Sequence, residues 1–377
     1  MNDPLLYSIA FSQIHGINLY ERKKLINVFG SALSIYNACQ QGAEAFVDLE
    51  IKSIESILSP WPLKAAAEEL ATMKLLNIDT CCIDDATYPN RLFQCEDAPT
   101  ILFYKGIKKW NLPYLISIVG TRNHTLYADK VIQALLEGIQ HLNLGVVSGL
   151  ALGIDGMVHE KACALKIPNW GVIATGLDDI YPAQHQRLAN KMIETGGGIL
   201  TENICDTAPL PYQFPKRNRI VAGMTDATIV IESAVEGGSM ITAKLARGYD
   251  REVFAVPGKI HDAKSKGCLW LIKNNIATMY HDPIQLLDNM NWPLQNDQAE
   301  NDHSNAATED LKTQSLLLSL PPILQSVFTC IQTQGPIHKD AISEQLAIPS
   351  PELSSHLLSL ELNSLIHLQA GNLYSVT

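Results

Sequence analysis

The chain has 377 residues, of which 46% are hydrophobic and 18% charged, and its formal net charge is −11 at pH 7. These totals are typical of a soluble globular protein of two or three domains, and the acidic balance argues against a protein that coats nucleic acid over its whole surface. No apolar run approaches the roughly 20 residues that a membrane helix needs. The first residues lack the features of a signal peptide, and the eight cysteines form no C-x-x-C pair. We therefore expect a reduced, cytoplasmic protein that does not associate with membranes.

Residues 1–80 have the apolar spacing of short helices separated by glycine turns. Leu5 and Ile9 precede Gly16, and Leu25 and Val28 precede Gly30. This pattern predicts a small helical domain, similar to a SAM or helix-hairpin-helix domain. A helix-hairpin-helix would bind the DNA backbone through turn amides. A helical packing module is the alternative, and it is favoured because the turn motif is weak.

From residue 81 to residue 290, apolar runs of strand length alternate with helical segments. Strands that are apolar throughout and separated by helices predict a parallel sheet covered on both faces. The fold class is thus α/β, with an extended Rossmann-like, doubly wound parallel sheet. A short helix is expected over 219–224. The expected strands cover 115–119, 145–148, 171–174, 198–202, 227–232 and 252–256.

Small-residue turns follow three of these strands, and a basic segment lies between the second and the third turn. The turns are Gly120-Thr-Arg, Ser148-Gly and Gly237-Gly-Ser. Amides at helix starts bind anions, and glycine lets a phosphate approach closely. From residue 214 to residue 273, ten Lys and Arg stand against six Asp and Glu. An aromatic residue beside cations suits single-stranded nucleic acid.

We therefore predict a groove for single-stranded nucleic acid at the carboxyl edge of the sheet, where cations neutralise phosphates, turn amides bind them and Phe214 stacks on a base. Its expected residues are Arg122, Ser148, Gly149, Phe214, Lys216, Arg217, Asn218, Arg219, Gly237, Gly238, Ser239 and Lys244.

Catalytic and metal motifs are weak by comparison. Asp155 and His159 stand four residues apart, but no third ligand follows at a diagnostic spacing, and Asp155 is the expected capping residue of a helix start. The chain has no Walker or G-x-G-x-x-G motif, and Ser148 is not in a G-x-S-x-G motif. We predict no catalytic residues, no metal and no cofactor. The alternative from another class is a Rossmann-like nucleotide-processing hydrolase that uses the turn at Gly237.

The last part of the chain predicts a linker and a separate domain. Residues 291–315 are rich in Asn, Asp, Gln and Glu, which is typical of a flexible linker. Residues 316–377 contain three helical patterns and two short strand-like runs, which resemble a winged helix. The helix that would read DNA, 351–361, has no Lys or Arg, so we interpret the domain as a packing or protein-interaction module. DNA binding by this domain stays open as a third possibility.

Seven motifs in order and at family spacing, within residues 88–280, resemble the DprA/Smf (DNA processing protein A) family. The resemblance implies a non-catalytic homodimer that binds and protects incoming single-stranded DNA and loads RecA onto it during natural transformation, with single-strand-binding protein as a further partner. It implies that Arg122 contacts the DNA backbone and Phe214 the bases. Pro211 stands where some members have a lysine, and Lys216 is the expected source of that charge. The motifs are Val119-Gly-Thr-Arg, Ser148-Gly-Leu-Ala-x-Gly-Ile-Asp-x-x-x-His, Gly176-Leu-Asp-x-x-Tyr-Pro, Thr201-Glu, Phe214-Pro-x-Arg-Asn-Arg-Ile-Val-Ala-Gly, Gly238-Ser-x-x-Thr-Ala and Val253-Phe-Ala-Val-Pro-Gly.

Overall fold

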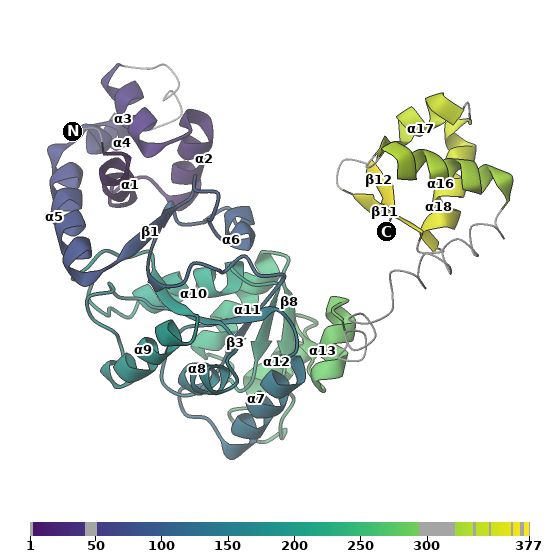
Figure 1. Cartoon of the computed structure of the whole chain (residues 1–377). Coiled ribbons are helices and arrows are strands. Elements are labelled where there is room, and N and C mark those ends of the chain that lie inside the picture. Colours follow the sequence, from purple (N-terminus) through teal and green to yellow (C-terminus); the bar gives the residue numbers. More distant parts are fainter. Residues whose placement is uncertain are drawn as a thin grey trace. The chain divides into compact units, whose positions relative to one another are not determined.

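The computed structural model contains two compact units, Met1–Trp292 and Pro293–Thr377, each with its own core (Figure 1). The described residues are 3–41, 51–293, 321–334, 337–346, 348–362, 365–369 and 373–376. The linker predicted over 291–315 lies outside them except for its first three residues.

A nine-stranded sheet forms the centre of the larger unit, with the order β1-β2-β6-β5-β4-β3-β7-β8-β9. The strands from β3 to β9 pair in parallel, whereas β2 is antiparallel to both β1 and β6. The predicted doubly wound α/β sheet is therefore confirmed, with two antiparallel strands added at one side. The strands are β1 (Asp79–Cys82), β2 (Ile101–Gly106), β3 (Tyr114–Val119), β4 (Leu144–Ser148), β5 (Asn169–Val172), β6 (Gly198–Thr201), β7 (Ala227–Val230), β8 (Glu252–Ala255) and β9 (Thr278–Met279).

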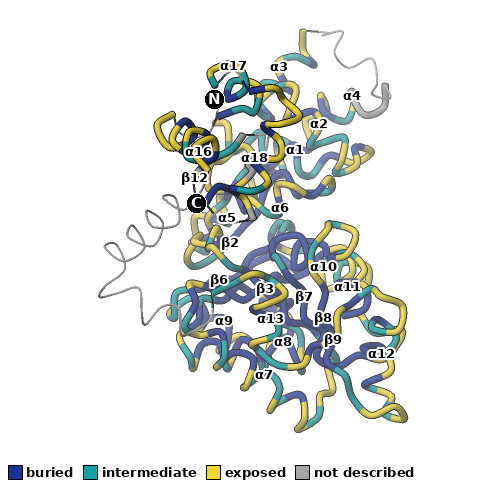
Figure 2. The backbone as a smooth tube through the Cα atoms, turned by 90° about the vertical axis from the view of Figure 1, so that its right-hand side faces the viewer, coloured by how far each residue is buried: buried dark blue, intermediate teal, exposed yellow. Residues whose placement is uncertain are grey.

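Helices cover this sheet and form the N-terminal part of the unit. Figure 2 shows strands β3, β7 and β8 in dark blue, as expected for apolar strands that are buried on both faces. No helix among the described residues is long and apolar enough to cross a membrane. The helices are α1 (Pro4–Ser12), α2 (Leu19–Phe29), α3 (Ala32–Gln40), α4 (Ile51–Leu58), α5 (Pro60–Leu76), α6 (Asn90–Gln94), α7 (Leu126–Ile139), α8 (Ile154–Ala164), α9 (Gln186–Glu194), α10 (Gln213–Gly223), α11 (Gly238–Gly248), α12 (Lys266–Lys273) and α13 (Pro283–Met290).

Helix α10 begins six residues before the start expected from the sequence. We predicted a short helix over 219–224, but the helix runs from Gln213 to Gly223. Pro215 lies in its first turn, where a residue without an N–H costs no intrahelical hydrogen bond. The whole basic segment from Phe214 to Arg219 is therefore helical, so its side chains point in different directions.

The winding of the sheet reverses at β3. From β3 the chain proceeds outward through β4, β5 and β6, and then returns to place β7 on the other side of β3. The carboxyl ends of β3, β4 and β7 meet at this point. In open α/β sheets, ligands bind in the crevice outside such a reversal.

The N-terminal helices share the core of the sheet. Buried Ile9 and Phe11 of α1 belong to the same apolar cluster as Leu102 of β2. Arg22 closes the loop between α1 and α2, since its Nε donates to the Ile17 carbonyl at 3.1 Å. The predicted helical character of residues 1–80 is thus present, inside a unit that extends to residue 292.

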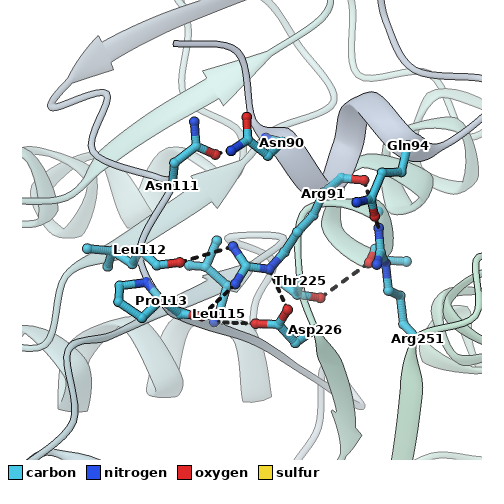
Figure 3. A network of polar contacts seen from close by, with 12 residues as sticks. Asn90, Arg91, Gln94, Asn111, Leu112, Pro113, Leu115, Thr225, Asp226 and Arg251 are labelled. Carbon is cyan, nitrogen blue, oxygen red and sulfur yellow. Dashed lines mark hydrogen bonds and ion pairs between the residues drawn. The ribbon is translucent and has the colours of Figure 1, made fainter. Parts of the chain in front are cut away.

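Arg91 fastens the segment before β3 to the opposite, amino edge of the sheet (Figure 3). Its guanidinium pairs with Asp226 and donates to the carbonyls of Leu112 at 3.1 Å and Pro113 at 2.7 Å. The second Asp226 oxygen accepts from the Leu115 amide at 2.8 Å. One arginine therefore joins the starts of β3 and β7.

The smaller unit is a winged helix, as predicted. Its helices are α16 (Pro322–Gln334), α17 (Lys339–Leu346) and α18 (Ser350–Leu362). Its sheet has the order β10-β12-β11, with strands β10 (Ile337–His338), β11 (Ile366–Gln369) and β12 (Leu373–Val376). Val327, Ile342 and Leu353 are fully buried in its core. A third strand, β10, thus joins the predicted hairpin.

Candidate nucleic-acid interface

A hollow of about 350 Å³ opens at the carboxyl edge of the sheet, where the winding reverses. Four segments line it: the turn after β3 with Arg122, the turn after β4 with Gly149, α10 with Phe214, and the start of α11 with Gly238. The structure thus brings three predicted glycine turns and the basic helix together in one place. This is the position at which the fold class binds ligands.

Arg122 and Phe214 lie next to each other in the wall of this hollow. Arg122 is exposed and its Cζ lies 5.6 Å from the centre of the Phe214 ring. Tyr181 lies 5.7 Å from the same ring at an angle of 57°, and its side chain is 42% exposed. Tyr181 was not among the predicted site residues, although its Tyr-Pro motif was noted. A cation and two aromatic rings therefore line one small patch, which suits a phosphate beside a base.

The turn after β4 is already occupied by a carboxylate of the chain itself. Asp155 Oδ2 accepts from the amides of Gly149 at 3.1 Å and Ala151 at 3.4 Å. The Ser148 hydroxyl is fully buried and donates to the Ile118 carbonyl at 2.7 Å. The predicted phosphate contact of Ser148 and Gly149 stays a prediction, and in this structure the Gly149 amide is already hydrogen-bonded to Asp155.

Arg217 neutralises this internal carboxylate. Its side chain is only 4% exposed, and its guanidinium donates to the carbonyls of Gly149 and Val172. Burial lowers the pKa of Arg217 to about 10, and nearby Asp155 opposes that effect. Burial likewise raises the pKa of the Asp155 carboxyl, against the attraction of Arg217. Arg217 therefore braces the turn after β4, and its predicted contact with a phosphate stays a prediction.

Arg219 is also withdrawn from the hollow. It is 5% exposed, pairs with Glu202 and donates to the Asp97 carbonyl at 2.6 Å. Because positions 217 and 219 lie about 200° apart on a helix, Arg217 and Arg219 reach different partners. The expected contact of Arg219 with a phosphate stays a prediction, and it would require breaking this buried ion pair to free the charge.

The two predicted lysines lie away from this hollow. Lys244 is exposed on α11 and its Nζ lies 5.2 Å from the Trp270 ring centre. Lys216 is exposed and lines a second hollow. Among the predicted cations of the described chain, Arg122 alone is both exposed and in the wall of the hollow at the winding reversal.

The start of α11 supplies the remaining polar groups of this hollow. Gly238 is exposed, with no atom within 4 Å of the position of an added Cβ, so a ligand can approach its backbone. The first amides of a helix have no partner inside the helix and attract anions. Gly237 has no such room, because a Cβ would meet Ser233 Oγ at 2.5 Å. Ser239 Oγ donates to that hydroxyl at 2.8 Å, and Asn218 Nδ2 donates to the Gly238 carbonyl at 3.3 Å.

A buried histidine lies behind the turn after β4. His159 Nδ1 is 2.9 Å from Asn169 Oδ1, and burial lowers the pKa of His159 to about 4, so the ring is neutral. Over the described ranges, no group of three or more His, Cys, Asp or Glu side chains could hold a metal ion. Asp155 and His159 each have an internal partner instead.

The fold and the site together define a Rossmann-like binding protein with an accessory winged helix. The family model for DNA recombination-mediator protein A matches residues 79–291, and that for the DprA winged helix domain matches residues 312–372. The chain belongs to the DNA recombination-mediator protein A (DprA/Smf) family. The resemblance seen in the sequence motifs is thereby confirmed.

Relatives and solved structures agree with this assignment. Protein Smf of Escherichia coli is 32% identical over 316 residues, which are 83% of this chain and 81% of that protein. DNA processing protein DprA of Bacillus subtilis is 38% identical over 212 residues, 56% of this chain and 71% of that protein. The crystal structure of the Streptococcus pneumoniae DprA has a TM-score of 0.59 and 29% identity, and covers 75% of this chain and 97% of that one. The structure of the Helicobacter pylori DNA processing protein A, studied for its single-stranded DNA binding mode, has a TM-score of 0.51 and 26% identity. It covers 56% of this chain and 95% of that one.

Proposed function

We propose that this protein is a recombination mediator that binds single-stranded DNA in the hollow at the winding reversal. The observation that carries the proposal is the pair of exposed Arg122 and half-buried Phe214, with Arg122 Cζ 5.6 Å from the ring centre, beside the open helix start at Gly238. A single strand offers both the anion and the flat face that this arrangement suits. Support comes from the Helicobacter pylori relative, which binds single-stranded DNA.

Each group has a separate task in this mechanism. Arg122 neutralises one phosphate, and the amides of Gly238 and Ser239 bind a neighbouring phosphate at the helix start. Phe214 and Tyr181 offer their rings to the bases. The chain acts by binding alone, so no covalent step is required of any of these residues.

The biological role follows from family membership. We propose that the bound strand is protected and passed to RecA during natural transformation, in exchange with single-strand-binding protein. We also propose that the protein acts as a homodimer. RecA filament assembly on strands covered by single-strand-binding protein is the test, and an assembly rate that this protein does not change would contradict the loading role.

DNA binding itself is tested by fluorescence anisotropy with single-stranded and duplex oligonucleotides over a salt series. Single strands should bind more tightly, with a slope of roughly −0.7 per phosphate neutralised. Equal binding of duplex DNA would contradict the proposal. Base release from nucleoside monophosphates would favour the hydrolase instead. Removing residues 293–377, which form the second compact unit, should leave binding intact; its loss would assign DNA binding to the winged helix.

A further inference from the structure

A second hollow, of about 330 Å³, lies along a different face of α10. Its walls come from the loop after α1 with His15, from the residues before β2 with Thr100, and from Gln213 and Lys216 of α10. The N-terminal helices therefore contribute to a cavity beside the DNA site. Gln213 and Phe214 are consecutive, yet one lines this hollow and the other lines the hollow at the winding reversal.

Unsatisfied polar atoms point to a missing ligand in this second hollow. Thr100 is 6% exposed, and its buried Oγ1 has no hydrogen-bond partner among the described residues. Gln213 Oε1 is also buried and, within the same described part of the chain, unpartnered. Glu202 adds a carboxylate to the wall, with one oxygen held by Arg219. Buried polar atoms are nearly always paired in folded proteins, so a ligand that donates hydrogen bonds would complete this wall.

The charges of the second hollow suit a nucleotide. Lys216 is exposed at its rim and, across the described ranges, has no ion-pair or hydrogen-bond partner. Arg22 contributes a second positive charge to the wall. Tyr212, at the start of α10, lines the hollow and is 64% exposed. A phosphate can therefore lie on Lys216 while the attached base enters between polar walls.

We propose that the second hollow is a nucleotide subsite for the same DNA strand and that it selects a base with an exocyclic amine. Adenine, cytosine and guanine carry such an amine, whose two hydrogens match the unpartnered acceptors Gln213 Oε1 and Thr100 Oγ1, whereas thymine presents carbonyl oxygens there. The strand would leave Phe214, cross the start of α10 and place its next phosphate on Lys216. This inference rests on the proposed single-stranded DNA binding.

Thr100→Val tests the polar wall without changing its volume. We expect oligo-dC of about 16 nucleotides to bind more tightly than oligo-dT of the same length, and the variant to reduce that preference by about fivefold, as the loss of one hydrogen bond would. Thr100→Ser keeps the hydroxyl and should retain the preference. Thermal unfolding should show that neither variant has lost the fold, because Thr100→Val removes an unpaired polar atom. An unchanged preference for oligo-dC in the valine variant would overturn the base selection.

Lys216→Ala tests the path of the strand independently, because this side chain is exposed. It should weaken binding of oligonucleotides of about 16 nucleotides and reduce their salt slope by about 0.7, but leave oligonucleotides of about 4 nucleotides unaffected. Lys74→Ala, at an exposed lysine of α5, is the control and should behave as wild type. Wild-type binding by the Lys216 variant at every length, together with weakened binding by Arg122→Ala, would overturn this subsite and leave the proposed function standing. A wild-type protein that binds no oligonucleotide would instead refute the proposed function.

Discussion

Replacing Phe214 by leucine separates base stacking from the general apolar character of the site. The ring is half-buried in the first turn of α10, with Arg122 at 5.6 Å and Tyr181 at 5.7 Å from its centre. Stacking of one base on an aromatic ring contributes about 1–3 kcal/mol. In the free protein the ring already contacts Arg122, and this cation–π contact is worth about 0.5–1 kcal/mol. A base that stacks on the ring replaces part of that contact, so we expect the leucine variant to lose about 1–2 kcal/mol of binding free energy. This corresponds to binding that is about 5- to 30-fold weaker.

Fluorescence anisotropy over a salt series measures both the affinity and the charge neutralised. The salt slope should stay the same, because leucine removes no charge. Phe93→Leu is the matched control: Phe93 is 43% exposed and Lys23 Nζ lies 4.8 Å from its ring centre, but it belongs to α6 and not to the site. Wild-type affinity in the Phe214 variant, or an equal loss in both variants, would refute stacking at Phe214.

Three further predictions test the charges and the packing of the site. Arg122→Ala should reduce the salt slope of single-strand binding by about 0.7, whereas Arg247→Ala, at an exposed arginine of α11, should leave it unchanged. If anisotropy gives the Arg122 variant the same slope as the wild-type protein, a phosphate contact by Arg122 is excluded. Gly149→Ala should lower the free energy of unfolding in urea by about 1–3 kcal/mol, because a Cβ would approach two charged side chains to 2.6 Å; an unchanged unfolding midpoint would contradict this packing. Burial holds the pKa of His159 at about 4, below its ordinary value. The contribution of the neutral ring to the free energy of unfolding is therefore complete above about pH 6.5. It is lost as the pH falls towards 4, by up to about 3 kcal/mol. His159→Gln should flatten this pH dependence of the unfolding free energy, and the exposed His261→Gln should keep it; the same curve for all three proteins would argue against a buried neutral ring.

The sequence was sufficient for the architecture because its signal is local and repeated. Each apolar run of strand length precedes a helical pattern, and this alternation predicts a parallel, doubly wound sheet without knowledge of any contact. The glycine turns were correctly placed at one edge for the same reason, since the carboxyl ends of parallel strands meet there. The antiparallel strands β1 and β2 were harder, because only the short helix α6 lies between them and five residues are too few for a clear helical period.

The roles of the basic residues could not be predicted, because they depend on partners far along the chain. Lys216, Arg217 and Arg219 look alike in a sequence, but burial of two of them depends on Asp155 at the start of α8 and Glu202 directly after β6. The predicted helix over 219–224 also began too late, because a first helical turn tolerates Pro215. Once the segment is helical, its side chains must diverge, and the shared basic patch divides into two braces and one exposed lysine.

The carboxylate that occupies the turn after β4 also has a consequence for competition inside a cell. Rossmann proteins that use a free nucleotide leave the corresponding amides open for its phosphate. Here Asp155 is a resident anion with hydrogen bonds to two of those amides, so a diphosphate arriving at this turn would meet like charge. Abundant metabolites such as nucleoside triphosphates would therefore gain little binding affinity from the amides of this turn. A polymer that is bound at several neighbouring points does not need a phosphate contact there.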